Sequence, residues 1–128
     1  MGLVYANIEL LSGEDLLAVR RGRLDESRVK RTTVTAMVDS GATMLAIPAF
    51  IKTQLDLLPM GELEADLADG SVSTYEIVGP IEVRYLNRRA SVEALVLPQQ
   101  TQVLLGAIPM EAMDALVDPK RQQLIVNP

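Results

Sequence analysis

Histidine and cysteine are both absent from the 128-residue sequence, and their absence removes much of the chemistry that hydrolases commonly use. Without His, neither a Ser-His-Asp nor a Cys-His arrangement can form, and His-ligated metal sites are excluded as well. Without Cys, disulfides, thiol nucleophiles and zinc-thiolate sites are excluded. Carboxylates, hydroxyls, Lys, Arg and Tyr remain as the candidates for acid–base or nucleophilic roles.

Aromatic residues and long apolar runs are scarce too. The chain has one Phe, three Tyr and no Trp, so aliphatic side chains must supply the core. No apolar stretch approaches the roughly 20 residues of a membrane span, and the N-terminus lacks the pattern of a signal peptide. We therefore expect a soluble, cytoplasmic protein without a membrane partner. The net charge of −5 disfavours a nucleic-acid partner.

The composition that is present favours one folded domain over residues 1–128, with 48% hydrophobic residues. Period-two alternation and turn signals predict many short strands. In chain order, the expected strands and apolar runs are 4–10, 34–38, 44–47, 62–68, 72–78, 81–85, 92–97, 102–105 and 123–126. A polar connection with a helical turn at 14–20 spans 12–31, and short helices are expected at 48–55 and 109–116. This pattern predicts a mainly β domain shaped as a small barrel.

The most informative segment is 33–43, in which an apolar-patterned strand runs directly into Asp39, Ser40 and Gly41. That order suits a carboxylate held at the tip of a tight loop and aimed at substrate. Alone, Asp-Ser-Gly is a weak pattern, because all three are ordinary turn residues. Its position between two apolar runs strengthens it. A loop there is expected to lie deep in the structure, where an unpaired carboxylate is costly and usually has a function.

Three competing patterns are weaker. Ser27 and Lys30 have the Ser-x-x-Lys spacing of serine acyl-enzymes, but the companion motifs are missing. Six of the twelve Lys and Arg residues fall in 20–31, which we interpret as a solvated face because Asp25 and Glu26 interrupt it. The carboxylates show neither EF-hand spacing nor a dense cluster, so no metal site is expected.

Four features together resemble the retropepsin-like aspartic proteases. They are the Asp39-Ser40-Gly41-Ala42 loop after a strand, the Asp69-Gly70 hairpin where that family has its flap, the Leu104-Leu105-Gly106 motif, and a helix after that glycine. Their order and approximate spacing match over about residues 30–127, and 117–126 is similar to bacterial members of the clan.

The resemblance implies a closed barrel of the retropepsin-like acid protease type and an aspartic endopeptidase that needs no cofactor. It implies a catalytic role for Asp39. It assigns support of the active-site loop to Ser40, Gly41, Ala42 and Thr43, a flap over the peptide substrate to Asp69, Gly70 and Ser71, and packing against the loop to Leu104, Leu105 and Gly106.

Peptide hydrolysis of this type needs two carboxylates a few ångströms apart that share one proton. Aspartic proteases are themselves the standard example of such a pair. This chain holds a single Asp-Ser-Gly, so the second carboxylate must come from another copy, and we expect a homodimer with the site on the two-fold axis. In the resembling family the terminal strands often build the dimer sheet, which makes 4–10 and 123–126 the candidates.

The chain also departs from retroviral members of the family. They have an Asp at the position of Thr43 and an Arg at the position of Ala107, and both ends of that charged pair are absent here. Two other interpretations stay open. One is a non-catalytic module of the same fold that binds peptides or dimerises. The other is an unrelated β-barrel interaction domain in which Asp39 merely forms a satisfied turn.

Overall fold

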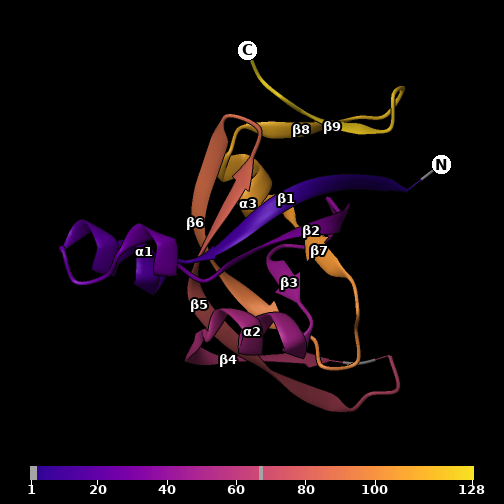
Figure 1. The fold of residues 1–128 in the computed structure, drawn as a ribbon. Coiled ribbons are helices and arrows are strands. Elements are labelled where there is room, and N and C mark those ends of the chain that lie inside the picture. The colour runs from indigo at the N-terminus through magenta and orange to yellow at the C-terminus, as the bar shows by residue number, and fades with distance from the viewer. Residues whose placement is uncertain (1–2, 67) are drawn as a thin grey trace.

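A closed barrel of six strands forms the centre of the protein (Figure 1). The structure is a computed structural model that describes residues 3–66 and 68–128. Strands account for 50% of the chain and helices for 19%. The predicted class, mainly β with a few short helices in a small closed barrel, is therefore confirmed.

The bounds of the elements follow the predicted pattern in most places. The strands are β1 (Val4–Ser12), β2 (Arg31–Val38), β3 (Leu45–Ile47), β4 (Leu58–Asp66), β5 (Val72–Tyr85), β6 (Arg88–Val96), β7 (Val103–Leu105), β8 (Ala115–Asp118) and β9 (Gln123–Val126). The helices are α1 (Gly13–Arg20), α2 (Ala49–Leu55) and α3 (Ala107–Ala112), with a 3-10 turn, η1 (Glu26–Arg28). Among the described residues, none of these helices combines the length and apolar character needed to cross a bilayer.

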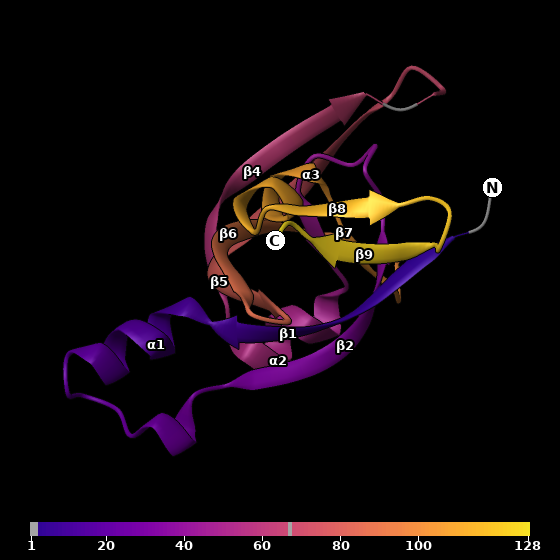
Figure 2. The same cartoon turned by 90° about the horizontal axis from the view of Figure 1, so that it is seen from above.

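The barrel closes because β1 has two neighbours. The strands follow one another in the order β1-β2-β7-β3-β6-β5, and β5 pairs back onto β1. Most neighbours are antiparallel, but β2 pairs parallel with β7 and β3 pairs parallel with β6. Strand β4 lies outside the ring, where it pairs antiparallel with β5. Strands β8 and β9 form a separate two-stranded sheet. Figure 2 shows this small sheet over one side of the barrel.

The core is aliphatic, as the shortage of aromatics predicts. Alternating residues of β1 and β5 point inward, and Ile8, Leu10, Ile81 and Val83 are almost completely buried. Each such side chain contributes roughly 1.5–3 kcal/mol by leaving water. Helix α2 covers one end of this core through Ile51 and Leu55, as expected for the 48–55 segment.

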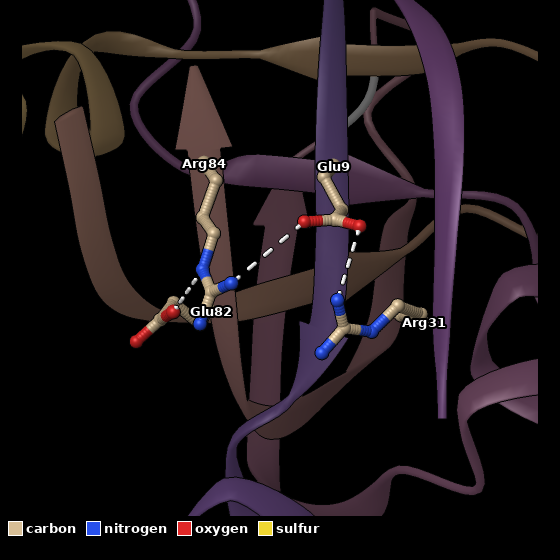
Figure 3. A network of polar contacts seen from close by, with 4 residues as sticks. All are labelled: Glu9, Arg31, Glu82 and Arg84. Carbon is tan, nitrogen blue, oxygen red and sulfur yellow. Dashed lines mark hydrogen bonds and ion pairs between the residues drawn. The ribbon is translucent and has the colours of Figure 1, made fainter. Parts of the chain in front are cut away.

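The seam where β1 meets β5 carries a chain of ion pairs (Figure 3). Glu9 lies opposite Arg84 in the strand register, and its carboxylate is 3.9 Å from Arg84 Nη1 and 3.6 Å from Arg31 Nη1. Arg84 Nε also donates to Glu82 Oε2 at 2.6 Å. Glu82 is buried, so Arg84 compensates a charge that would otherwise be strongly unfavourable.

Several sequence predictions need correction at the strand ends. The strands predicted at 34–38 and 92–97 begin earlier, at Arg31 and Arg88, and the second ends at Val96. The strands predicted at 72–78 and 81–85 are one strand, β5, whose pairing register shifts at Gly79 and Pro80. The strand predicted at 62–68 begins earlier, at Leu58, and ends at Asp66. Its position 67 lies outside the described residues, and Ala68 belongs to the turn.

The predicted helix at 109–116 is wrong in its second half. Helix α3 runs from Ala107 to Ala112, and the chain then turns at Asp114, which has a left-handed φ of 53°. Leu116 lies instead in β8, which pairs antiparallel with β9. The spacing of Met110, Met113 and Leu116 is typical of a helix, but pairing with a strand further along the chain outweighs this local preference.

The segment between β1 and β2 projects from the barrel, with α1 leading outward from the end of β1 (Figures 1 and 2). No residue of α1 is buried. Asp15 closes the segment at its base, since its carboxylate accepts the Lys30 amide at 2.9 Å and pairs with Lys30 Nζ at 2.9 Å. Burial acts to raise the pKa of Asp15, but these contacts with Lys30 outweigh it and leave the pKa below its ordinary value.

Candidate active site

The loop that carries Asp39 leaves the barrel at a position set by long-range pairing. Val38, the last residue of β2, lies beside Leu105 of β7 in the parallel register. The next amide, that of Asp39, donates to the Leu105 carbonyl oxygen at 2.9 Å. The end of β7 therefore determines where the Asp39 backbone lies.

Within the loop, the Asp39 side chain forms a tight turn with its own backbone. Its Oδ1 accepts the Gly41 amide at 3.0 Å, and its carbonyl oxygen accepts the Ala42 amide at 3.1 Å. Ser40 and Gly41 are exposed and Asp39 is half-buried. Among the described residues no other hydrogen bond reaches the Asp39 carboxylate, so Oδ2 is accessible to water or to a second carboxylate.

The expectation that this loop lies deep in the structure is not met within one chain. Ser40 and Gly41 are exposed, so no residue that the structure describes covers them. A half-buried carboxylate in a satisfied turn carries little desolvation cost. The depth of burial therefore does not by itself assign a function to Asp39.

Gly106 of the glycine motif packs directly against the segment that follows Asp39. A side chain at Gly106 would place its Cβ 2.3 Å from the Met44 carbonyl oxygen and 2.8 Å from that of Ala42. Leu105 before it is fully buried and Leu104 is half-buried. Only glycine allows the two backbones to approach so closely.

Backbone hydrogen bonds join the loop to α3 where the retroviral charged pair is missing. The Ala107 amide donates to the Ala42 carbonyl oxygen at 2.8 Å, and the Ile108 amide donates to that of Thr43 at 2.8 Å. These two bonds connect the same two segments, so the absence of charge at Thr43 and Ala107 leaves the loop anchored.

The predicted flap is the tip of the β4–β5 hairpin, whose last strand pair is Asp66 with Val72. Asp69 Oδ1 accepts the Ser71 amide at 2.9 Å and the Ser71 hydroxyl at 2.5 Å. The Ser71 hydroxyl and, next, its amide hold the pKa of the Asp69 carboxyl below its ordinary value. Asp69, Gly70 and Ser71 are all exposed, and no hydrogen bond or ion pair within the described residues joins them to the Asp39 loop.

Two grooves with mainly apolar linings lie in this region, one lined in part by Met44, just after the Asp39 loop, and the other lined in part by Ser40 of the loop. One, of about 330 Å³, is lined by Met44, Ile77, Ser91, Val92, Glu93 and Ile108. The other, of about 290 Å³, is lined by Ser40, Ala107, Met110, Glu111, Ala115, Leu116 and Val117. Apolar grooves beside an accessible carboxylate suit the side chains of an extended peptide. The sequence gives little sign of these grooves, because their walls come from segments far apart in the chain.

The competing patterns have structural roles. The Ser27 hydroxyl donates to the Asp25 carboxylate at 3.0 Å, and Lys30 is bound to Asp15. Neither side chain faces the other as a nucleophile and base would. Within residues 3–66 and 68–128, no group of three or more Asp and Glu side chains is placed to hold a metal ion.

The comparison with known families separates the retropepsin-like interpretations from an unrelated β-barrel. A family model of aspartyl proteases, of the retropepsin-like kind, matches residues 17–107 of the 128-residue chain. The chain belongs to this aspartyl protease family. The matched range includes the Asp39 loop, the β4–β5 hairpin and the Leu104-Leu105-Gly106 motif, and it ends before β8. No curated protein matches the chain.

Membership of the family supports a peptidase-like hydrolase whose substrates are peptides. An unrelated β-barrel interaction domain is therefore not supported.

Proposed function

We propose that the protein is an aspartic endopeptidase that acts as a homodimer, with one Asp39 from each subunit in a shared site. The observation that carries the proposal is the single Asp39 carboxylate, anchored by β7 and exposed on one side. One carboxylate cannot act as base toward water and at the same time, as an acid, polarise the scissile carbonyl. A second chain supplies the missing group.

In this proposal the two carboxylates share one proton, because two like charges so close cannot both ionise. The ionised Asp39 takes a proton from water as the water oxygen bonds to the scissile carbonyl carbon. The protonated Asp39 gives its proton to the carbonyl oxygen, which produces a tetrahedral diol. As the carbon–nitrogen bond breaks, the Asp39 that took the water proton gives it to the departing amine. One hydroxyl of the diol returns its proton to the other Asp39, so that a carboxylic acid forms and the pair is restored. No cofactor is needed.

The other predicted residues have supporting roles in the proposal. The two Ser40 hydroxyls bond across the axis and orient the carboxylates, and Gly41 lets the substrate approach the loop backbone. The Asp69-Gly70-Ser71 tip closes over an extended peptide, which binds mainly through its backbone as an added strand. The tip and the end of β2 lie toward the same side of the barrel in both views, consistent with this role (Figures 1 and 2).

A mixing experiment tests the shared site. Wild-type chains are mixed with an equal amount of Asp39→Asn chains, allowed to exchange subunits, and assayed on a peptide library from acid to neutral pH. If the site is shared, mixed dimers are inactive. Under random pairing, activity per total chain then falls to roughly a quarter of that of pure wild-type protein. If each chain acts alone, activity per total chain falls only to half of that of pure wild-type protein, and the shared-site proposal fails.

The same assay addresses the non-catalytic module. A wild-type protein that forms dimers but cleaves no library peptide at any pH would support binding or dimerisation as the retained role. Cleavage retained by pure Asp39→Asn protein would refute the catalytic role of Asp39. The cytoplasmic location stays a prediction from the sequence.

A further inference from the structure

The larger of the two grooves near the Asp39 loop, of about 330 Å³, has a single charged group in its lining. Its apolar walls are Met44, Ile77, Val92 and Ile108, and its polar members are Ser91 and Glu93. Glu93 is exposed, and among the described residues no hydrogen bond or ion pair reaches its carboxylate. The groove therefore combines an aliphatic surface with one free negative charge on the side of the solvent.

The strand register places this groove just after the Asp39 loop. Leu45 of β3 pairs parallel with Ala94 of β6, so the residues before them, Met44 and Glu93, lie side by side where β3 begins. Met44 is five residues after Asp39, and five residues of extended chain span at most about 18 Å. A peptide bound in extended form at Asp39 therefore reaches the groove within about five of its own residues.

The remaining walls lie between the loop and the base of the candidate flap. The Ile108 amide donates to the Thr43 carbonyl oxygen at 2.8 Å, which connects the start of α3 to the loop. Ile77 is paired on both sides, with Gly61 of β4 and Leu95 of β6, whereas the residues of β5 before it pair with β4 alone. The groove thus lies where the hairpin leaves the barrel, beside the path of a peptide under the flap.

The charges around the groove have one sign. Segment 58–78, which contains the candidate flap, has no Lys or Arg and five carboxylates, namely Glu62, Glu64, Asp66, Asp69 and Glu76. Of these, Glu76 pairs with Lys52. The only charged group that lines the second groove is also an acid, Glu111. Charges of one sign steer ligands of the opposite sign toward a site, so this surroundings favours a cationic peptide over an acidic one.

We propose that this groove binds a Lys or Arg side chain of the peptide substrate, and that Glu93 selects it. The inference rests on the proposed function and names the substrate class of the same site. Lys and Arg bury their methylene stems against apolar surface and keep the charged end near water. The stem lies along Met44, Ile77 and Ile108, and the cation reaches Glu93. A leucine in the same place leaves the carboxylate unpaired, and a glutamate meets a like charge.

Paired peptides test this preference. Two sets of peptides are identical except at one position, which holds lysine or norleucine, whose side chain has the same four carbons and no charge. That position is moved through five residues on each side of the cleaved bond. In the wild-type protein kcat/KM should be about two- to fivefold higher for lysine, the range for an exposed ion pair. Because a two-fold site has one such groove on each side, one position on each side should respond.

Substitutions then assign the preference to Glu93. Glu93→Gln should bring the ratio of kcat/KM for lysine and norleucine close to one at the responding positions, and Glu93→Lys should make glutamate the preferred residue there. Glu14→Gln is the matched control, because it removes the same charge from an exposed carboxylate on α1, outside the site. It should retain the wild-type ratio.

Peptide binding gives a readout that does not need hydrolysis. Labelled lysine and norleucine peptides are titrated with Asp39→Asn protein at pH 7, and fluorescence anisotropy gives the Kd of each. The lysine peptide should bind about two- to fivefold more tightly, and Glu93→Gln in the same background should abolish the difference.

The outcomes separate this inference from the proposed function. Hydrolysis with a wild-type ratio of one, with a ratio that Glu93→Gln retains, or with a ratio that Glu14→Gln also abolishes would overturn the role of Glu93 and leave the proposed function standing. Binding that depends on Glu93, without hydrolysis by the wild-type protein, would retain the groove and remove the proposed activity. Neither hydrolysis nor a binding preference would overturn both.

Discussion

Two turns of this chain contain the same three residue types and the same local hydrogen bond, yet only one is built into the barrel. In Asp39-Ser40-Gly41 and in Asp69-Gly70-Ser71, the first carboxylate accepts the amide two residues later, at 3.0 and 2.9 Å. The first turn is also bonded to Leu105 and packed against Gly106, whereas the second lies at the tip of an exposed hairpin. The local motif makes a turn in both places, and tertiary anchoring distinguishes the Asp39 loop from the exposed hairpin tip.

The largest difference between the two turns is expected in activity. Asp39→Asn should reduce peptide hydrolysis on the order of 10²–10⁴-fold, because it removes an acid–base group. Asp69→Asn should retain most of the activity, since an amide oxygen can still accept the Ser71 amide. Initial rates on a common peptide, with folding checked by circular dichroism, measure both. Equal losses of activity in the two variants would contradict a catalytic role that only the first turn holds.

The anchoring of the first turn is expected to appear in stability. Gly106→Ala forces a Cβ against the Met44 and Ala42 carbonyl oxygens and should cost about 1–3 kcal/mol, since overpacking displaces neighbouring backbone. Gly61→Ala is the matched control: its Cβ would meet no atom within 4 Å, and its change should stay within about 0.5 kcal/mol. Urea unfolding of the two variants compares them. A Gly106→Ala protein as stable as wild type would show that the close approach does not hold the loop.

The glycine inside the first turn is expected to affect activity more than stability. A Cβ at Gly41 would meet only Asp39 Oδ1, at 3.3 Å, and Gly41 is not in the left-handed region. Gly41→Ala should therefore fold with a loss below about 1 kcal/mol. We expect hydrolysis to fall by about tenfold or more, because the added methyl group stands where substrate or partner approaches.

Gly70→Ala is the counterpart in the second turn. Its φ of 84° strains any side chain, and no atom lies within 4 Å of its Cβ. It should lose about 1 kcal/mol of stability and retain activity. Unfolding and rate measurements on the two alanine variants together separate a glycine required by the fold from one required by the site. If Gly41→Ala kept its activity and Gly70→Ala lost it, Gly41 would have no special role in hydrolysis.

The smallest effect concerns the titration of the second turn. The pKa of Asp69 is held down by Ser71, so Ser71→Ala should raise it toward its ordinary value, with the amide bond retained. A carboxyl whose pKa is lower in the folded protein adds stability above the pKa of the unfolded chain, and this contribution is lost as the pH falls through the folded pKa. The stability of the Ser71→Ala protein should therefore fall less steeply than that of wild type as the pH is lowered through this range. Carboxyl NMR titration measures the change, and an unaltered pKa would contradict the assigned cause.

The sequence predicts well those features that are encoded locally. Alternation before Asp39 identifies the strand, and Asp69-Gly70 identifies the hairpin. It fails at β8, because four residues are too few for a strand pattern and Met110, Met113 and Leu116 fit a helical period. The partner strand β9 lies beyond a turn at 119–122, and only pairing with it makes β8 a strand.

The candidate site likewise has some features with a local sequence signal and others that depend on long-range pairing. Asp39 and Gly106 can be found from their motifs, whereas the contact between their two segments depends on the parallel pairing of β2 with β7, across more than sixty residues of chain. The grooves beside the loop depend on the same long-range pairing. Neither the exposure of Asp39 nor the place of Glu93 in its groove has a local signal, since each reflects which parts of the chain are left uncovered after the barrel has closed.

The projecting segment between β1 and β2 gives experimenters a convenient attachment point. Gly22 follows α1 with a φ of 71°, and no atom lies within 4 Å of the position that its Cβ would occupy. A short peptide inserted there would extend away from the core, so the barrel should tolerate a fluorescent label or an affinity tag. Two differently coloured preparations could then test the proposed dimer for subunit exchange without any change near the Asp39 loop.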